Sequence, residues 1–330
     1  MNIPFSILEL ASIGEGVTIE ETFKKSLDLA QKAEEFGYKR FWLAEHHNMI
    51  SIASSATSVL IGYIAGGTKK IRVGSGGIML PNHSPLIVAE QFGTLGALYP
   101  SRIDLGLGRA PGTDQITAHA IRSDRMQAVY AFPDEVSKIQ QYFSSENNDS
   151  KVRATVAEGV QVPVYILGSS TDSAHLAAKK GLPYVFASHF APTHLFEALN
   201  IYHNQFEPSE VLQEPHTIAG LNVIIADTDE EAERISTSMI RMMLGVITGN
   251  IDYIQKPVEM TSDLRAVAEH PALKQMMKYS FVGSKETVKE KTKEFLEKTK
   301  VDELMVVSHI YHHEDRVKSY KLFAELMEEV

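Results

Sequence analysis

Short apolar segments alternate with helical segments along the chain, and this alternation restricts the fold more than any other feature. Eight apolar runs have the length and composition of buried parallel strands: Phe5–Leu10, Arg40–Ala44, Ile71–Met79, Ile103–Gly108, Pro163–Leu167, Pro183–Ala187, Thr217–Ala226 and Glu303–Val307. Helical stretches lie between and after them: Ile19–Phe36, Ala53–Ala65, Pro85–Leu98, Ser123–Phe143, Thr171–Lys180, Pro192–Phe206, Asp229–Met243, Lys285–Thr299 and Glu314–Glu329. Since eight β/α units fit this length, the pattern predicts a (β/α)8 barrel.

A doubly wound open sheet is the competing architecture, but its dinucleotide-binding fingerprint is missing. Gly106-Leu107-Gly108-Arg109 follows a predicted strand, yet no third glycine opens a helix behind it. Two insertions interrupt the β/α rhythm, one over Ala110–Arg122 after the fourth strand and one over Leu244–Phe281 between the seventh and eighth helices. Long connections of this kind are usually functional in a compact domain. We predict a single domain over residues 1–330.

Composition excludes several classes of protein. The chain has 330 residues and no cysteine, which excludes a disulfide scaffold, a cysteine-ligated metal and a cysteine nucleophile. A net charge of −10 without a basic stripe disfavours nucleic acid as a partner. The first residues lack a basic segment followed by a long apolar stretch, and no run approaches 18 apolar residues. We therefore expect a cytoplasmic protein with neither a signal peptide nor a membrane span.

Polar side chains gather at the carboxyl ends of the predicted strands, where barrel enzymes carry their active sites. The strand ends supply these groups: Glu45-His46-His47-Asn48, Gly74–Gly77, Gly108-Arg109, Gly168-Ser169-Ser170, Ser188-His189 and Ser308-His309, with His312-His313 close behind. An isolated histidine is more often a packed core residue, but the position of His46 at a strand end favours a functional role. Since adjacent residues on a strand point in opposite directions, one of His46 and His47 should face the mouth and the other should pack behind it. Glu45 is suited equally to orienting these rings and to a catalytic role of its own.

Three features of the mouth predict a ligand that carries an anion beside a flat group. Arg109 ends a buried strand, where desolvation of its charge would be costly unless it meets an anion. Ser169 and Ser170 precede a predicted helix, and hydroxyl groups at a helix N-terminus bind phosphate, although a simple N-cap is the plain alternative. Gly76-Gly77 within a strand indicates a bulge or a close approach of backbone to a ligand. FMN fits this inventory, and a metal held by the histidines is the rival.

Several motifs resemble those of the bacterial luciferase-like flavin monooxygenases. They occur in the order Phe36–His47, Ile71–Pro81, Pro85–Gln91, Pro100–Arg109, Val164–Ser170, Gly181–Pro183 and Phe281–Ser284, across nearly the whole chain. This resemblance implies a barrel that binds reduced FMN and uses O2 to oxygenate a small organic substrate. The chemistry then belongs to the cofactor, and the protein supplies orientation and a dry pocket.

The same resemblance assigns individual residues. His46 corresponds to the family histidine that assists the oxygen chemistry of the reduced flavin, and Gly76–Gly77 to a cis peptide beneath the flavin ring. Arg109, Arg125, Ser169 and Ser170 correspond to the phosphate contacts. The true luciferases carry an acid at the position of Ser169 and a cysteine at that of Gly108, so this chain resembles a relative that is not a light emitter.

Other functions remain open at this stage. A metal-dependent barrel hydrolase would need an His-x-His at the first strand and an Asp at the eighth, but these strands end in Glu9-Leu10 and Ser308-His309. A catalytically quiet flavin-binding protein and the use of the deazaflavin F420 are further alternatives. Because no nicotinamide fingerprint is present, reduced FMN would come from a separate reductase or from nicotinamide bound transiently at the same face.

Two helices lack the polar face that an outer barrel helix needs. The stretch Ala53–Gly67 has no charged residue, and Pro85–Leu98 carries only Glu90. A helix that is apolar all round is normally buried on both sides, so a second subunit would cover these helices across a two-fold axis. We expect a homodimer with Gly93 in its seam; the alternative is that Leu244–Phe281 folds over them within one chain.

Overall fold

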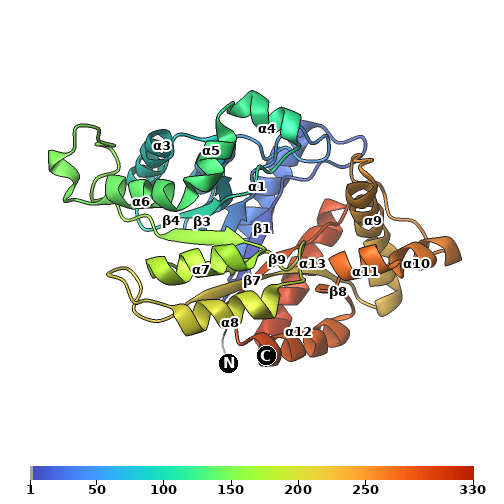
Figure 1. The fold of residues 1–330 in the computed structure, drawn as a ribbon. Helices are drawn as coiled ribbons and strands as arrows, with labels where there is room; N and C mark the ends of the chain where they lie inside the picture. Colours follow the sequence, from blue (N-terminus) through green and yellow to red (C-terminus); the bar gives the residue numbers. More distant parts are fainter. Residues whose placement is uncertain (1–2) are drawn as a thin grey trace.

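The strands form a closed parallel barrel with the helices packed around it (Figure 1). The structure is a computed structural model that describes residues 3–330 apart from the side chain of Asn148. Within these residues the barrel strands are β1 (Phe5–Glu9), β2 (Arg40–Leu43), β3 (Arg72–Met79), β4 (Ile103–Gly108), β5 (Val164–Gly168), β6 (Tyr184–Phe186), β7 (Thr217–Ile225) and β9 (Glu303–Val307). They run in the order β6-β5-β4-β3-β2-β1-β9-β7, and the β6–β7 pairing closes the ring. The predicted (β/α)8 architecture and its eight strands are confirmed.

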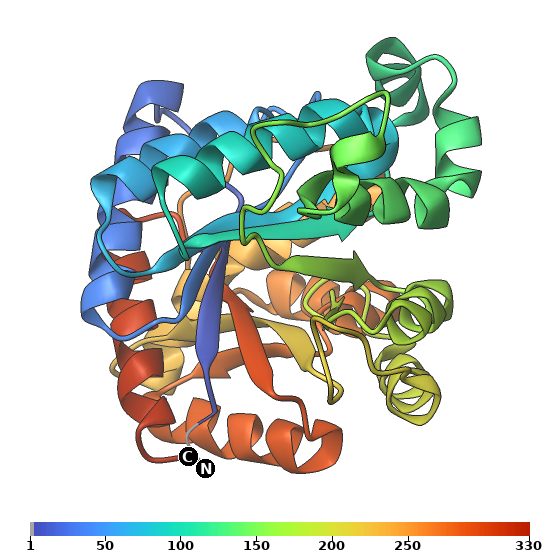
Figure 2. The same ribbon diagram turned by 90° about the vertical axis from the view of Figure 1, so that its left-hand side faces the viewer.

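The helices surround the ring of strands, as the two views together show (Figures 1 and 2). They are α1 (Ile19–Glu35), α2 (Thr57–Gly67), α3 (Pro85–Leu98), α4 (Gln115–Ile121), α5 (Arg125–Tyr130), α6 (Phe132–Phe143), α7 (Thr171–Lys180), α8 (Leu195–Gln205), α9 (Asp229–Thr248), α10 (Ser262–Ala268), α11 (Pro271–Met276), α12 (Lys285–Thr299) and α13 (His313–Met327), with short 3-10 turns at Leu80–Asn82 and Asn147–Asp149. No helix in the described part of the chain is long and apolar enough to cross a membrane.

An additional strand, β8 (Ser280–Gly283), was not predicted. It pairs in parallel with Asn222–Ile225, the half of β7 that extends beyond the pairing of β7 with β6. A four-residue segment carries too little periodicity to be recognised as a strand. The segment becomes a strand because β7 is long enough to extend beyond β6, and this exposed part of β7 provides an edge for pairing.

The predicted helix Ser123–Phe143 is two helices. Helix α5 ends at Tyr130 and α6 begins at Phe132, with Pro133 in its first turn. Proline supplies no N–H and its ring collides with the carbonyl four residues earlier, so one continuous helix cannot pass through this position. The short helix α4 lies within the predicted insertion Ala110–Arg122.

The second insertion adds residues to a small apolar cluster that α9 and the end of β7 build. Helix α9 continues five residues beyond its predicted end, and α10 and α11 lie beside it at the right of Figure 1. Buried Met239, Met243 and Leu273 belong to this cluster. The cluster is separate from the main core, which fills the space between the barrel and its outer helices.

Buried charges join the first residues of several strands, at the end of the barrel opposite the predicted mouth. Arg40 donates to Glu303 through Nε (2.9 Å) and to Asp104 through Nη1 (2.7 Å). Ser6 also donates to Glu303, at 2.5 Å. Burial by itself would raise the pKa of Glu303, but the hydrogen bond from His216 and the charge of Arg40 lower it to about 2. At this end of a barrel, such a network stabilises the fold.

Glu303→Gln should therefore reduce stability strongly at neutral pH. Breaking a buried ion pair leaves Arg40 undercompensated, which costs about 3–5 kcal/mol. Because the pKa of Glu303 lies below its unfolded value, its contribution is present above about pH 4.5 and is lost as the pH falls toward 2. Denaturation of both proteins at pH 7 and pH 3 should show a smaller difference at pH 3. The exposed Glu294→Gln is the control, and an equal effect of the two variants at pH 7 would contradict the prediction.

Candidate active site at the barrel mouth

His46 follows β2 at the barrel mouth, and its hydrogen bonding fixes the tautomer. Its Nδ1 lies 3.2 Å from the carbonyl oxygen of Gly112, which can only accept, so Nδ1 carries the proton. Burial lowers the pKa of His46 below the ordinary value of 6.5. A neutral ring with Nδ1 protonated leaves the lone pair of Nε2 available. His46 can therefore accept a proton or a hydrogen bond at the mouth.

Two further histidines surround the mouth, at the ends of β6 and β9. Burial and the nearby charge of His46 lower the pKa of His189 to about 4. Burial and the nearby charge of His189 lower the pKa of His309 to about 3. All three rings therefore favour the neutral form near pH 7. The sequence placed these histidines at strand ends but could not show that they approach one another across the barrel.

Glu45 is the hub that holds the ends of β2 and β3 together. It is buried and accepts from His47 Nε2 (2.9 Å), His83 Nε2 (2.9 Å) and the Met79 amide (2.9 Å). Burial would raise the pKa of Glu45, but the hydrogen bonds from His47 and His83 lower it to about 2. The His47 ring is turned toward Glu45, whereas the His46 ring contacts the carbonyl oxygen of Gly112. Both residues follow the end of β2 at Leu43, so the alternation along a strand does not decide their orientation. Glu45 acts as an orienting group.

The glycine pair lies where β3 departs from regular pairing with β4. The register shifts between Ser75 and Ile78, and the Gly76–Gly77 peptide bond is cis. A Cβ on Gly77 would lie 2.7 Å from the carbonyl oxygen of Gly106, so no larger residue fits without a shift of the backbone. The predicted bulge and the cis peptide are both present, and the close approach at Gly77 is to the neighbouring strand.

The structure brings the predicted phosphate contacts together at the ends of β4 and β5. Arg125 Nη2 donates to the carbonyl oxygen of Arg109 (3.2 Å), and Arg109 Nη2 donates to Asp172 in the first turn of α7 (3.0 Å). One part of the sequence argument is wrong, since the Arg109 side chain is 44% exposed and needs no anion to compensate for burial. Arg125 is the buried arginine of the pair.

The start of α7 completes this cluster. Ser170 is the N-cap residue, but within the described structure its hydroxyl makes no capping hydrogen bond. The plain N-cap alternative therefore does not account for this serine. A helix N-terminus with an unused hydroxyl beside two arginines is a site suited to an anion.

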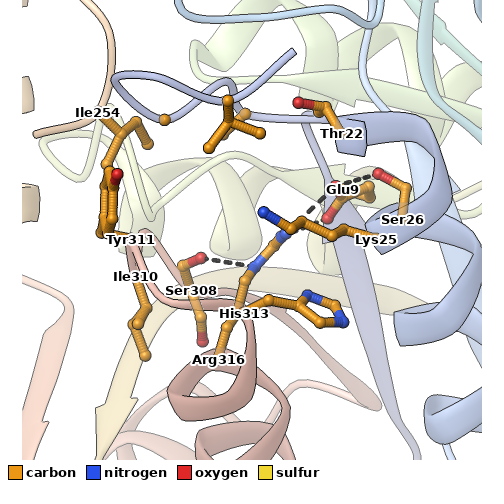
Figure 3. A pocket seen from close by; sticks show the side chains of 13 residues that line it. Glu9, Thr22, Lys25, Ser26, Ile254, Ser308, Ile310, Tyr311, His313 and Arg316 are labelled. Carbon is orange, nitrogen blue, oxygen red and sulfur yellow. Dashed lines mark hydrogen bonds and ion pairs between the residues drawn. The ribbon is translucent and has the colours of Figure 1, made fainter. Parts of the chain in front are cut away.

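The histidines that follow the last strand do not join the mouth. His313 opens α13 and its Nε2 bonds to Asp28 of α1 at 2.7 Å. Figure 3 shows it beside Arg316 and Ser26 in a cavity of about 30 Å³ between α1 and α13. Arg316 in this cavity is paired with the buried Glu9. His312 and His313 thus belong to the start of α13, where His312 is the N-cap residue and His313 contacts α1.

Metal coordination finds no support in the arrangement of these side chains. Among the residues that the structure describes, no group of three or more histidine, aspartate or glutamate side chains is placed to hold a metal ion.

Comparison with known proteins identifies the family. The family model described as luciferase-like monooxygenase matches residues 3–303. A luciferase-like monooxygenase of Escherichia coli K12 is 45% identical over 328 residues, which cover 99% of this chain and 98% of the relative. The N-acetyl-S-alkylcysteine monooxygenase of Bacillus subtilis is 34% identical over 329 residues, or 98% of each chain. This chain belongs to the luciferase-like monooxygenase family.

Solved structures agree with this assignment. Apo-MsnO8 superposes with a TM-score of 0.90 at 33% identity, over 99% of both chains. The oxygenating constituent of 3,6-diketocamphane monooxygenase from Pseudomonas putida, solved in complex with FMN, has a TM-score of 0.75 at 18% identity, over 98% of this chain and 97% of that one. At this identity the second likeness concerns the fold alone.

Proposed function

We propose that this protein is an FMN-dependent monooxygenase that uses reduced flavin and O2 to oxygenate a small organic substrate. The observation that carries the proposal is the buried Arg125 beside Arg109 and the uncapped start of α7. This cluster presents positive charge and free donors to one anion, as the phosphate of FMN requires. The FMN complex of the diketocamphane enzyme and the name of the N-acetyl-S-alkylcysteine relative support a flavin and an oxygenation.

On this proposal, some residues at the mouth would bind the flavin, and others would lie beside the reacting groups. Arg109, Arg125, Ser169 and Ser170 would hold the phosphate at the ends of β4 and β5, and Gly76-Gly77 on β3 would lie against the flavin ring. When bound, reduced FMN supplies the electrons and the oxygen-activating chemistry. His46 would accept a hydrogen bond or a proton through Nε2, and the neutral His189 and His309 would border the organic substrate at the ends of β6 and β9.

Spectroscopy and product analysis test this proposal. Titration with FMN should perturb the flavin spectrum, and F420 tested in parallel should bind less tightly. A separate flavin reductase should then supply reduced FMN under 18O2 with S-alkyl thioethers tested first, because a relative is named for such a substrate. One labelled oxygen in the product supports a monooxygenase. Flavin binding without oxygenation of any substrate in a broad panel would support the quiet flavin-binding alternative.

We also propose that the protein is a homodimer built on α2 and α3. Large apolar side chains are exposed on these helices: Val59 (70%), Tyr63 (43%), Ile87 (47%) and Leu98 (64%). Large apolar side chains exposed on two neighbouring helices support a protein–protein interface. However, Gly93 does not belong to that face, since a Cβ there would lie 2.6 Å from Ala157 of the same chain. The placement of Gly93 in the seam is therefore wrong, and a substitution such as Gly93→Arg would disturb the packing within the chain instead of testing the dimer.

Val59→Arg is the appropriate test of the dimer. Light scattering on the wild type should give twice the 36.6 kDa chain mass, and the variant should shift toward one chain because it places charge in the apolar face. Val211→Arg is the matched control, because Val211 is an equally exposed valine (71%) in the loop after α8. A wild type that measures one chain at micromolar concentration refutes the dimer.

A further inference from the structure

Among the residues that the structure describes, the buried guanidinium of Arg125 is held only by neutral acceptors. Its Nε donates to Asn82 Oδ1 (3.2 Å) and its Nη2 to the carbonyl oxygen of Arg109 (3.2 Å). The side chain is 7% exposed, and among the described residues it forms no ion pair with a carboxylate. Burial lowers the pKa of Arg125, with no compensating acidic neighbour. A buried, uncompensated charge is costly, and an arriving anion would remove that cost.

The orientation of Asn82 is fixed by acceptors on its other side. Asn82 is 6% exposed, and its Nδ2 donates both to Glu45 Oε1 (3.1 Å) and to the carbonyl oxygen of Pro111 (2.9 Å). Both acceptors require the amide nitrogen, so the amide oxygen must face the guanidinium. Asn82 therefore links the Glu45 hub to Arg125.

The charge of Glu45 does not neutralise Arg125 through this link. Glu45 accepts from two histidine rings, a backbone amide and Asn82, so its oxygens are fully engaged on the β2–β3 side. Asn82 is held in place by Glu45 and in turn fixes the position of Arg125, but it contributes no charge of its own. An aspartate in its place would form an ion pair with Arg125. It would also set an oxygen against Glu45 Oε1 and the carbonyl oxygen of Pro111, where the amide nitrogen now donates, so the alanine variant is compared with it.

We infer that Asn82 is the positioning residue of Arg125, holding the guanidinium through a neutral acceptor so that its charge remains available to the phosphate of the ligand. The inference rests on the proposed binding of FMN at this cluster. In the sequence, the polar pair Asn82-His83 directly after Pro81 and β3 is the local signal for this position.

Flavin-binding measurements with Asn82→Asp test the inference. The variant should lose affinity for FMN by roughly 10-fold or more, the size expected for one hydrogen bond to a charged group. Riboflavin, which lacks the phosphate, should bind as it does to the wild type. Inorganic phosphate should compete with FMN on the wild type more strongly than on the variant. The loss should diminish as the pH falls and the introduced carboxyl becomes protonated, when each value is compared with the wild type at the same pH.

Two further variants separate positioning from a general defect. Asn204→Asp adds the same charge at an exposed site on α8 and should leave both affinities unchanged. Asn82→Ala should weaken FMN binding independently of pH, and it should have no further effect when Arg125→Gln is already present, since it acts through that residue. Asn82→Ala also tests the inference if Asn82→Asp does not fold.

The outcomes distinguish the two proposals. If the wild type binds FMN and riboflavin equally, the phosphate site itself is refuted. If the wild type prefers FMN and the folded Asn82 variants keep that preference at every pH, the phosphate site stands and the role of Asn82 is overturned. An undiminished effect of Asn82→Ala in the Arg125→Gln background would likewise overturn it.

Discussion

His46→Ala is expected to bind FMN nearly as tightly as the wild type while product formation falls by roughly 10²–10⁴-fold, the range for loss of a general acid–base group. The reason is the free Nε2 of a ring whose Nδ1 is bonded to Gly112. His46→Asn can retain the donor to Gly112 but has no atom at the position of Nε2. It should therefore be as inactive as the alanine variant.

The pH dependence follows from the direction of the pKa shift. Burial lowers the pKa of His46, so the neutral form with a free Nε2 predominates at pH 7. The rate should be constant above this pKa and should fall at more acidic pH, as Nε2 becomes protonated. His194→Ala, an exposed histidine at the start of α8, is the control. Loss of flavin binding or of thermal stability in parallel with activity would make His46 a structural residue.

Arg125→Ala is expected to reduce FMN affinity by roughly 10–150-fold, the equivalent of a charge-assisted hydrogen bond. Arg125 is buried and forms no ion pair with a carboxylate among the described residues. Its interaction with an anion is therefore little screened by water. Arg109→Ala should have the smaller effect, because Arg109 is exposed and already paired with Asp172. The sequence singled out Arg109 by its place at a strand end, whereas the burial of the side chains favours Arg125.

Riboflavin is the ligand that makes this comparison specific. Its affinity should not change in either arginine variant, since it lacks the phosphate. Arg265→Ala removes an equal charge from the exposed helix α10 and should alter neither affinity. A larger loss with Arg109→Ala than with Arg125→Ala would show that the exposed arginine carries the phosphate contact.

The sequence by itself determined the barrel and the end of it at which the candidate site is proposed. Buried parallel strands are short apolar runs, and the separating helices have their own periodicity, so both signals are local. The chemistry of a barrel lies at the carboxyl ends of its strands, which is why His46 and Ser169-Ser170 could be selected from position alone. The break between α5 and α6 is equally local, because Pro133 by itself indicates that a new helix begins there.

Tertiary packing decided which residues are buried and which side chains contact one another. Small residues on a helix indicate a close approach but not the identity of the partner, so Gly93 was assigned to a second subunit when Ala157 of the same chain occupies that space. The burial of a residue after a strand depends on the next loop, which leaves Arg109 exposed and covers Arg125. The contact of Asn82 with Arg125 joins residues 43 positions apart. Such pairings arise only when the barrel closes, because hydrogen bonds and charge compensation require atoms within a few ångströms and sequence order does not record that distance.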